Sequence, residues 1–442
     1  MACTHEWNVF FLDASNTFNF TSYVKGFSLH QGVQIARVSS YNGYMHLDNN
    51  SNIFTPGAGG SYHGMNWFST FVQIKCQIND GATTSTANVA HMVVTDIDFQ
   101  DDGEEATVML TLSDYYSYAG RDQVKEIDVT TAYGLLDDVG ETILNGGGGI
   151  SRVPFPAFGA SSDTVVALNK VNNVPSGSET SPGYWGIIDE FDSGTAKDHL
   201  NAQVLPSGPA IVYPTTASYG SNTWTLNSNY VNRKLTKESV SSTDHYRVFE
   251  FTADKTADKF PIQKVSTQYN LTNTINQASI QAVYPVTGEP ANVSNDTTSQ
   301  STVGVRSVTY SKIITWQFGG ATQADKAIIG DFWTTRFSDV TYTPQRLSIL
   351  LEAVDGEMDS SSRQNYADFL DVSTGLWSIA AVTFTPKGAS SSKTFDCVIS
   401  GRQIFATPYS TTISLDLLPA IDNQSFTLDK ANVGVLNENR LG

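Results

Sequence analysis

Cysteines, basic residues and long apolar runs are all scarce in this sequence. Its three cysteines, Cys3, Cys76 and Cys397, lie far apart, and no Cys-x-x-Cys pair or Cys/His cluster occurs. A disulfide framework and a structural zinc site are therefore not indicated, and we expect three buried small hydrophobic residues. No apolar run reaches the roughly 18 residues of a membrane-spanning helix, and the first residues lack the pattern of a signal peptide. We expect synthesis in a cytoplasm and no membrane segment.

Basic residues are outnumbered by acidic ones. The chain has 26 Lys and Arg against 44 Asp and Glu, a net charge of −18. Affinity for nucleic acid comes from basic side chains that displace phosphate counterions, so this balance argues against a nucleic-acid-binding protein. An acidic surface suits a wall that DNA must pass without adhering, and it equally suits simple solubility.

No catalytic or cofactor motif is present. The sequence has no Gly-x-Ser-x-Gly, His-Glu-x-x-His, P-loop or Gly-x-Gly-x-x-Gly, and its seven histidines are scattered. A calcium loop starting at Asp98 fails, because its third position is Gln100 and its twelfth is Met109. The four glycines at 146–149 favour a hinge over a phosphate loop, since no Lys-Ser/Thr follows. We predict no catalytic residue, no cofactor and no metal ion.

The most regular pattern is a hairpin over residues 91–114. Apolar residues alternate with polar ones along both strands, at Met92, Val94, Ile97 and Phe99 and then at Ala106, Val108, Leu110 and Leu112. Asp101-Asp102-Gly103 predicts the tight turn, because glycine takes a positive φ without steric cost. The tip is acidic and is the one candidate site, as a surface of a channel or of a ring contact: Asp101, Asp102, Glu104 and Glu105.

The rest of the chain predicts a mainly β protein with a few helices (β-rich α+β) in three domains. Residues 1–122 read as a first antiparallel β-sandwich or half-barrel, with strands at 7–12, 23–29, 33–38, 44–47 and 71–78 before the hairpin. Residues 123–245 read as a smaller α+β domain, with a short helix at 195–203, a strand at 210–213 and a longer helix at 131–144. That longer helix would pack through Leu135, Leu136, Val139 and Ile143.

Residues 246–425 read as a second β domain, followed by a C-terminal tail at 426–442. Strands are expected at 246–251, 262–269, 347–351, 376–384, 395–404 and 411–418. A helix at 322–337, ended by Pro344, would bury Ala327, Ile328, Phe332 and the stem of Arg336. The first and last domains share a strand-dense rhythm with a late long hairpin, which predicts two copies of one fold.

Several segments together resemble the tail hub proteins, also called baseplate hub or minor tail proteins, of long-tailed bacteriophages. They are LDNNSNIFTP at 47–56, VVTDIDF at 93–99, ATVMLTLSDYY at 106–116, the helix before Pro344, FDCVISGR at 395–402, FTLD at 426–429 and GVL at 434–436 with Leu441. The order and spacing of these segments are more specific than any one of them. Residues 123–245 match only loosely.

The resemblance implies a structural virion protein without enzymatic activity. Its two β domains would be tail-tube-like, and a homotrimer would form a ring with pseudo-sixfold symmetry at the tail tip. The implied partners are the distal tail protein ring, the tape measure protein and a central fibre or tail tip protein, with DNA only as passing cargo during ejection. The implied location is the virion, at the tail tip or baseplate, after synthesis in the bacterial host cytoplasm.

Two other functions compete with the tail hub. Aromatic residues predicted on polar loops, Trp67, Trp185 and Trp224, would suit a surface carbohydrate-binding or adhesin-type β protein. A β-sandwich polysaccharide hydrolase would instead need two convergent carboxylates in a cleft. Both require exposed groups in a groove, whereas the hub would bury most aromatic residues at contacts.

Overall fold

The structure is a computed structural model. It describes residues 2–116 apart from 14, 15, 58, 63, 102 and 104, and then 123–124, 194–199, 201, 211–220, 223–231, 247–269, 274–282, 291–313, 321–338 and 342–420. Within these residues the chain is mainly β with a few helices, as predicted. The predicted helix at 131–144, the glycines at 146–149 and the tail at 426–442 lie outside the described residues.

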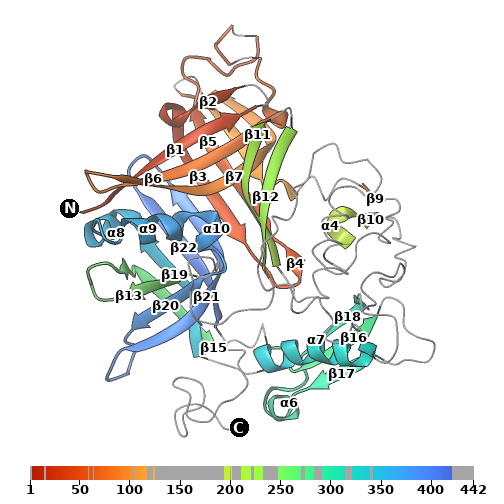
Figure 1. Cartoon of the computed structure of the whole chain (residues 1–442). Coiled ribbons are helices and arrows are strands. Elements are labelled where there is room, and N and C mark those ends of the chain that lie inside the picture. The colour runs from red at the N-terminus through yellow and green to blue at the C-terminus, as the bar shows by residue number, and fades with distance from the viewer. Residues whose placement is uncertain are drawn as a thin grey trace.

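A single 14-stranded sheet runs through most of the described chain (Figure 1). Seven of its strands form the N-terminal unit: β1 (Thr4–Leu12), β2 (Thr17–Asn19), β3 (Val24–Gly32), β5 (Ser40–Asp48), β6 (Phe71–Asn79), β7 (Thr84–Asp101) and β8 (Ala106–Ser113). The other seven form the C-terminal unit: β13 (Val248–Thr252), β14 (Phe260–Pro261), β15 (Lys264–Tyr269), β19 (Tyr342–Leu350), β20 (Ile379–Phe384), β21 (Lys393–Ala406) and β22 (Thr411–Pro419).

The two units have the same strand order. Neighbouring strands run β2-β1-β6-β7-β8-β5-β3 in the N-terminal unit and β14-β13-β20-β21-β22-β19-β15 in the C-terminal unit. Numbered by their sequence within each unit, both orders read 2-1-5-6-7-4-3. The sixth strand carries a register shift at the same place in both units, between Val94 and Asp96 in β7 and between Ile399 and Gly401 in β21. The predicted duplication is therefore confirmed in strand order, while the domain boundaries stay a prediction.

One strand of the large sheet differs from the antiparallel prediction, in two pairings. β13 is parallel to both β14 and β20, whereas β1 is antiparallel to β2 and β6. The chain enters β13 beside the start of β20, where the Ile379 N–H donates to the Arg247 carbonyl at 2.8 Å. Entry at that end sets the direction of the strand.

The hairpin predicted at 91–114 is present as β7 and β8, with Gly103 at a φ of +86° in its turn. Met92, Val94, Val108 and Leu110 are buried on its inner part, and the side chains become exposed toward the tip. One hydrophobic core continues from this hairpin through both units and contains all three cysteines.

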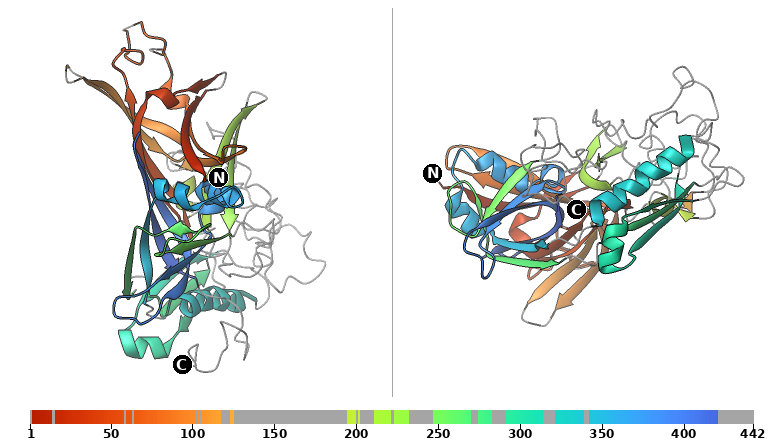
Figure 2. Two further views of the ribbon diagram at one scale, coloured as in Figure 1. Left: turned by 90° about the vertical axis from the view of Figure 1, so that its left-hand side faces the viewer. Right: turned by 90° about the horizontal axis from the view of Figure 1, so that it is seen from below.

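Helices of the C-terminal unit lie where the two units meet. α8 (Leu351–Glu357), α9 (Arg363–Leu370) and α10 (Val372–Gly375) connect β19 to β20 and pack against β1, β6 and β7. The left view of Figure 2 shows them in light blue at the waist of the molecule, between the red and orange strands above and the blue strands below. The sequence interpretation missed them, although Leu351, Val354 and Met358 are buried at helical spacing.

Smaller elements surround this sheet. The segment between β15 and β19 contains β16 (Gln277–Ala282), β17 (Asn292–Asn295), β18 (Ser307–Ile313), α6 (Thr297–Val303) and α7 (Ala321–Phe337). Other elements are β4 (Arg37–Val38), β9 (Gln123–Val124), β10 (Gly194–Thr195), α4 (Ala196–His199), β11 (Ile211–Gly220), β12 (Thr223–Val231), and the 3-10 helices η1 (Thr21–Tyr23) and η2 (Trp67–Ser69). None of the helices described is long and apolar enough to cross a membrane.

Four sequence predictions need correction. The strand at 33–38 shrinks to β4, because Ala36 has a positive φ of 62° that breaks the extended chain. The short helix predicted at 195–203 begins one residue later, at Ala196, because Thr195 pairs with β9, and the end predicted for it at 203 lies outside the described residues. Pro344 lies inside β19 at a register shift in its pairing with β15, where a missing N–H is tolerated. On α7 the buried apolar residues are Ile329, Phe332 and Trp333, which face β16. Ala327, predicted to be buried, is only half-buried, and the side chains of Ile328 and Arg336 are not among those described.

Candidate assembly surfaces

The two units are joined in the middle of the sheet by β3 and β21. The first half of β21 pairs with β20, and its second half pairs antiparallel with β3, from Gly401 opposite Gly32 to Ala406 opposite Phe27. β21 changes partner at its bulge, next to Gly401. The junction therefore joins the third strand of one unit to the sixth strand of the other.

Arg402 fixes this junction from inside. Its side chain is 1% exposed. Nε donates to Gln31 Oε1 and Nη1 donates to the carbonyls of Phe369 and Leu370, each at 2.9 Å, while Nη2 lies 3.5 Å from the Val89 carbonyl. Burial lowers the pKa of the guanidinium to about 10, with Tyr41 and Asp371 opposing the shift, so the group stays charged at neutral pH. One side chain thus connects β3, β7 and α9.

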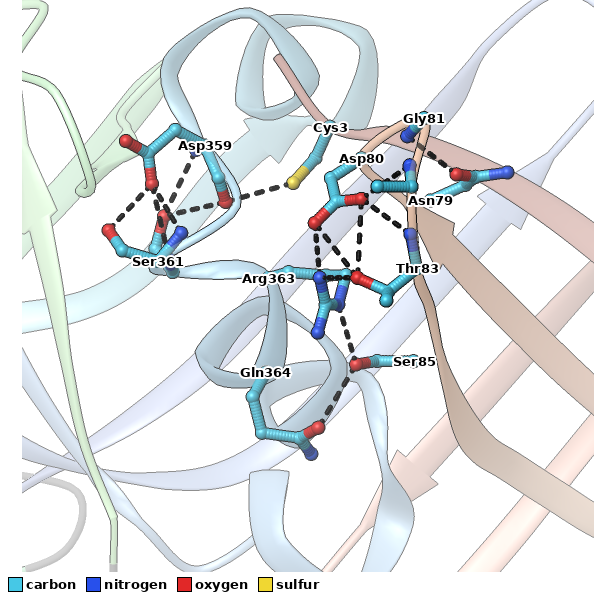
Figure 3. A network of polar contacts seen from close by, with 12 residues as sticks. Cys3, Asn79, Asp80, Gly81, Thr83, Ser85, Asp359, Ser361, Arg363 and Gln364 are labelled. Atoms are coloured by element: carbon cyan, nitrogen blue, oxygen red, sulfur yellow. Dashed lines mark hydrogen bonds and ion pairs between the residues drawn. The ribbon is translucent and has the colours of Figure 1, made fainter. Parts of the chain in front are cut away.

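A second polar network holds α9 against the N-terminal unit (Figure 3). Asp80, in the β6–β7 turn, forms an ion pair with Arg363, which also donates to Thr83 and to Ser85 Oγ at 3.0 Å. Gln364 Oε1 accepts from the same Ser85 hydroxyl at 3.0 Å. The backbone N–H groups of Thr83 and Ala82 and the Arg363 guanidinium keep the pKa of Asp80 well below its usual range.

His91 connects the N-terminal unit to β11. It is 3% exposed, and its Nδ1 lies 3.1 Å from the Thr215 carbonyl while Nε2 lies 2.6 Å from Gln73 Nε2. Nδ1 therefore donates and Nε2 accepts, which requires a neutral ring. Burial, together with nearby Lys75, lowers the pKa of His91 to about 4, against the opposing effect of the Thr215 carbonyl.

The acidic tip of the hairpin is partly paired. Asp101 Oδ1 accepts from the Gly103 N–H at 2.9 Å, and Glu105 forms an ion pair with Lys25 at 3.1 Å. Asp102 and Glu104 lie outside the described residues. A role of this tip in a channel or a ring contact stays a prediction.

A cavity of about 540 Å³ lies between β1 and α8, lined among others by His5, Trp7, Glu352, Asp355 and Tyr409. Asp355 is engaged on both oxygens, at 2.8 Å from His5 Nδ1 and at 3.1 Å from the Tyr366 hydroxyl. Glu352 accepts the Thr411 N–H at 2.8 Å. These carboxylates therefore fix α8, and no group of three or more His, Cys, Asp or Glu that could hold a metal ion occurs among the residues described.

Two of the three tryptophans proposed for a sugar-binding groove do not lie on exposed polar loops. Trp67 is buried in an aromatic cluster with Phe11, Phe20 and Phe54. Trp224 lies in a strand, β12, instead of a loop, and Trp185 lies outside the described residues.

No protein family model matches the sequence, and no curated protein matches it. Among solved structures, the chain is similar to the tail protein from Neisseria meningitidis MC58, at 10% identity and a TM-score of 0.48, over 93% of this chain and 96% of that one. It is similar to the 43 kDa tail protein of prophage MuSo2 from Shewanella oneidensis, at 12% identity and a TM-score of 0.46, over 94% and 100%.

A third similar structure is the E. coli c3393 protein, at 9% identity and a TM-score of 0.40, over 90% of this chain and 74% of that one. It is described as a component of the type VI secretion system with structural similarity to T4 bacteriophage tail proteins. The chains that resemble this one in structure thus include phage tail proteins, the class that the sequence segments resemble.

Proposed function

We propose that this chain is a structural protein of a bacteriophage tail, and that three copies form the hub ring at the tail tip. The ring would join the tail tube and the distal tail protein to the central fibre or tip. It would surround part of the channel through which DNA leaves the particle, and the chain would have no enzymatic activity.

The observation that carries the proposal is the duplicated strand order. Two units with the order 2-1-5-6-7-4-3 are joined head to tail, the third strand of the first to the sixth strand of the second. A head-to-tail contact that repeats gives a closed ring when its rotation divides a full turn and an open filament when it does not. Three chains of two units supply six similar positions, which matches a sixfold tube.

The charge of the chain supports a channel role. A net charge of −18 disfavours contacts to phosphate, and each such contact would slow the passage of DNA. We therefore propose that the inward surfaces of the ring are acidic or neutral.

Two measurements test the proposal. Light scattering of the full-length chain, alone and with the neighbouring tail proteins, should give three times the mass of the 442-residue chain. Gold-labelled antibody against the chain should mark the tail tip of intact particles. A chain that stays monomeric in every mixture, or label on the head of the particle, would overturn the proposal.

A surface carbohydrate-binding protein is the second candidate. The observation that favours it is Tyr409, 92% exposed at the rim of the cavity that also contains Trp7. Binding to host cell-wall glycan that Tyr409→Ala abolishes, in a chain that never forms rings, would support this function over the hub.

A further inference from the structure

We infer that the exposed edge of β7 over residues 96–101 pairs with β15 of a second copy of this chain. This rests on the ring proposed above and identifies the two strands that would close it. It follows from comparing the two units at the point where they already meet.

The sixth strands of the units differ in one respect. β21 is covered along its whole length, by β20 over 393–398 and by β3 over 401–406. β7 is covered by β6 over 84–93, but among the described residues no strand pairs with the same edge over 96–101. The third strands differ in the complementary way, because β3 pairs on both sides while β15 pairs only with β19 in the described chain.

The register of the missing pair can be derived from the existing one. The bulges align Asp96 with Gly401, so residues 96–101 correspond to 401–406. In the N-terminal unit the pairings lead from β7 through β8 and β5 to β3, and in the C-terminal unit they lead from β21 through β22 and β19 to β15. Followed from Asp96 and from Gly401, these two paths show that Phe27 in β3 corresponds to Val265 in β15. Since Ala406 pairs with Phe27, Asp101 should pair with Val265 of the next copy.

The same register sets three further pairs. Gln100 should lie opposite Ser266, Phe99 opposite Thr267, and Asp98 opposite Gln268 of the next copy.

Side-chain exposure agrees with a strand missing from this edge. Phe99 pairs with the buried Val108 and lies on the same face, yet it is 36% exposed. Its counterpart in the C-terminal unit, Ile404, is 0% exposed because β3 lies beside it. An added β15 would cover Phe99 in the same way.

Charge selects the partner for this edge. Residues 96–101 carry three aspartates and no base, so two β7 edges would repel one another. β15 carries Lys264 and no acidic residue. In the derived register Lys264 directly precedes Val265, the residue opposite Asp101, so the base of β15 lies at the acidic end of the β7 edge.

The test is a cross-link in the full-length chain. Gln100 and Ser266 are both exposed, and opposite residues in an antiparallel pair bring Cα atoms within the range that a disulfide spans. The matched variant combines Gln100→Cys with Ser266→Cys. The control combines Asp96→Cys with Ser266→Cys, which shifts the thiols four residues out of register, about 13 Å.

Mild oxidation of the matched variant should yield two and three linked copies, reversed by reductant, with about tenfold more product than the control. The unmodified chain should yield none, because its three cysteines are buried. A trimer by light scattering whose matched variant does not cross-link, or cross-links no better than the control, would overturn the strand pairing and leave the hub standing. A chain that is only monomeric would instead overturn the proposed ring itself.

Discussion

Replacing His91 with glutamine should remove a pH dependence from the stability of the folded chain. The neutral ring donates through Nδ1 to the Thr215 carbonyl and accepts through Nε2 from Gln73, in a site that is 3% exposed. A proton on Nε2 would face the Gln73 amide hydrogens and introduce a charge without a carboxylate partner. The folded state therefore resists protonation of His91.

The lowered pKa fixes the sign and the size of the effect. The pKa is 6.5 for an ordinary histidine and about 4 for His91 in the folded chain. Between these values the unfolded chain binds a proton that the folded chain does not, so the free energy of unfolding falls as pH falls from 6.5 to 4. The full loss is about 3 kcal/mol, of which about 2 kcal/mol is lost by pH 5.

Urea unfolding followed by tryptophan fluorescence between pH 8 and pH 5 measures this loss. Other titrating groups contribute equally to the parent chain and to His91→Gln, so the difference between the two isolates His91. The exposed His30 provides the matched control, and His30→Gln should retain the pH dependence of the parent chain. Parallel stability curves for the parent chain and His91→Gln would refute the reasoning.

Three further predictions concern the junction and the free edge. Arg402→Met should lower the free energy of unfolding by about 3 kcal/mol or more, because it leaves three buried acceptors without donors; unchanged urea midpoints would contradict this. Gly375→Ala should destabilise the same site in thermal melting, because its Cβ would clash with the Phe369 carbonyl oxygen. Gly356→Ala is the control, since a Cβ there meets nothing within 4 Å. Phe99→Glu should leave melting nearly unchanged, since Phe99 is already 36% exposed, but should abolish ring formation by light scattering; rings at the parent concentration would argue against the edge contact.

The sequence predicted the β elements better than their connections. Alternation along the 91–114 hairpin and the many strands at both ends predicted the duplicated units. Burial of one face of a sheet produces alternating apolar and polar residues, which can be recognised in the sequence. The junction was not predictable in this way. Arg402 reads as a surface residue in sequence, and only the approach of Gln31 and the α9 carbonyls makes its burial possible.

The helices α8–α10 were missed for a related reason. Their sequence contains Asp355, Gly356 and Glu357 directly after a predicted strand, a local composition that is more typical of a polar loop than of a helix. Their buried residues do recur at helical spacing, but they face the other unit, and residue order does not show which segment hundreds of residues away will cover them. The exposed edge at 96–101 likewise indicates a missing partner strand only when it is compared with residues 401–406 of β21, which are covered by β3.

The two units carry different insertions at the same point of the shared fold, and this makes their junctions unequal. Between the fourth and fifth strands the C-terminal unit has α8–α10, whose Arg363 binds the N-terminal unit, whereas the N-terminal unit has the segment 49–70. The contact within one chain is therefore held by strand pairing, by Arg402 and by the helices together. At residue 97, which corresponds to Arg402, the proposed contact between chains has an isoleucine and so lacks a buried guanidinium. The contact within the chain should form during folding, and the contact between chains should form afterwards and reversibly, so that closure of the ring depends on protein concentration.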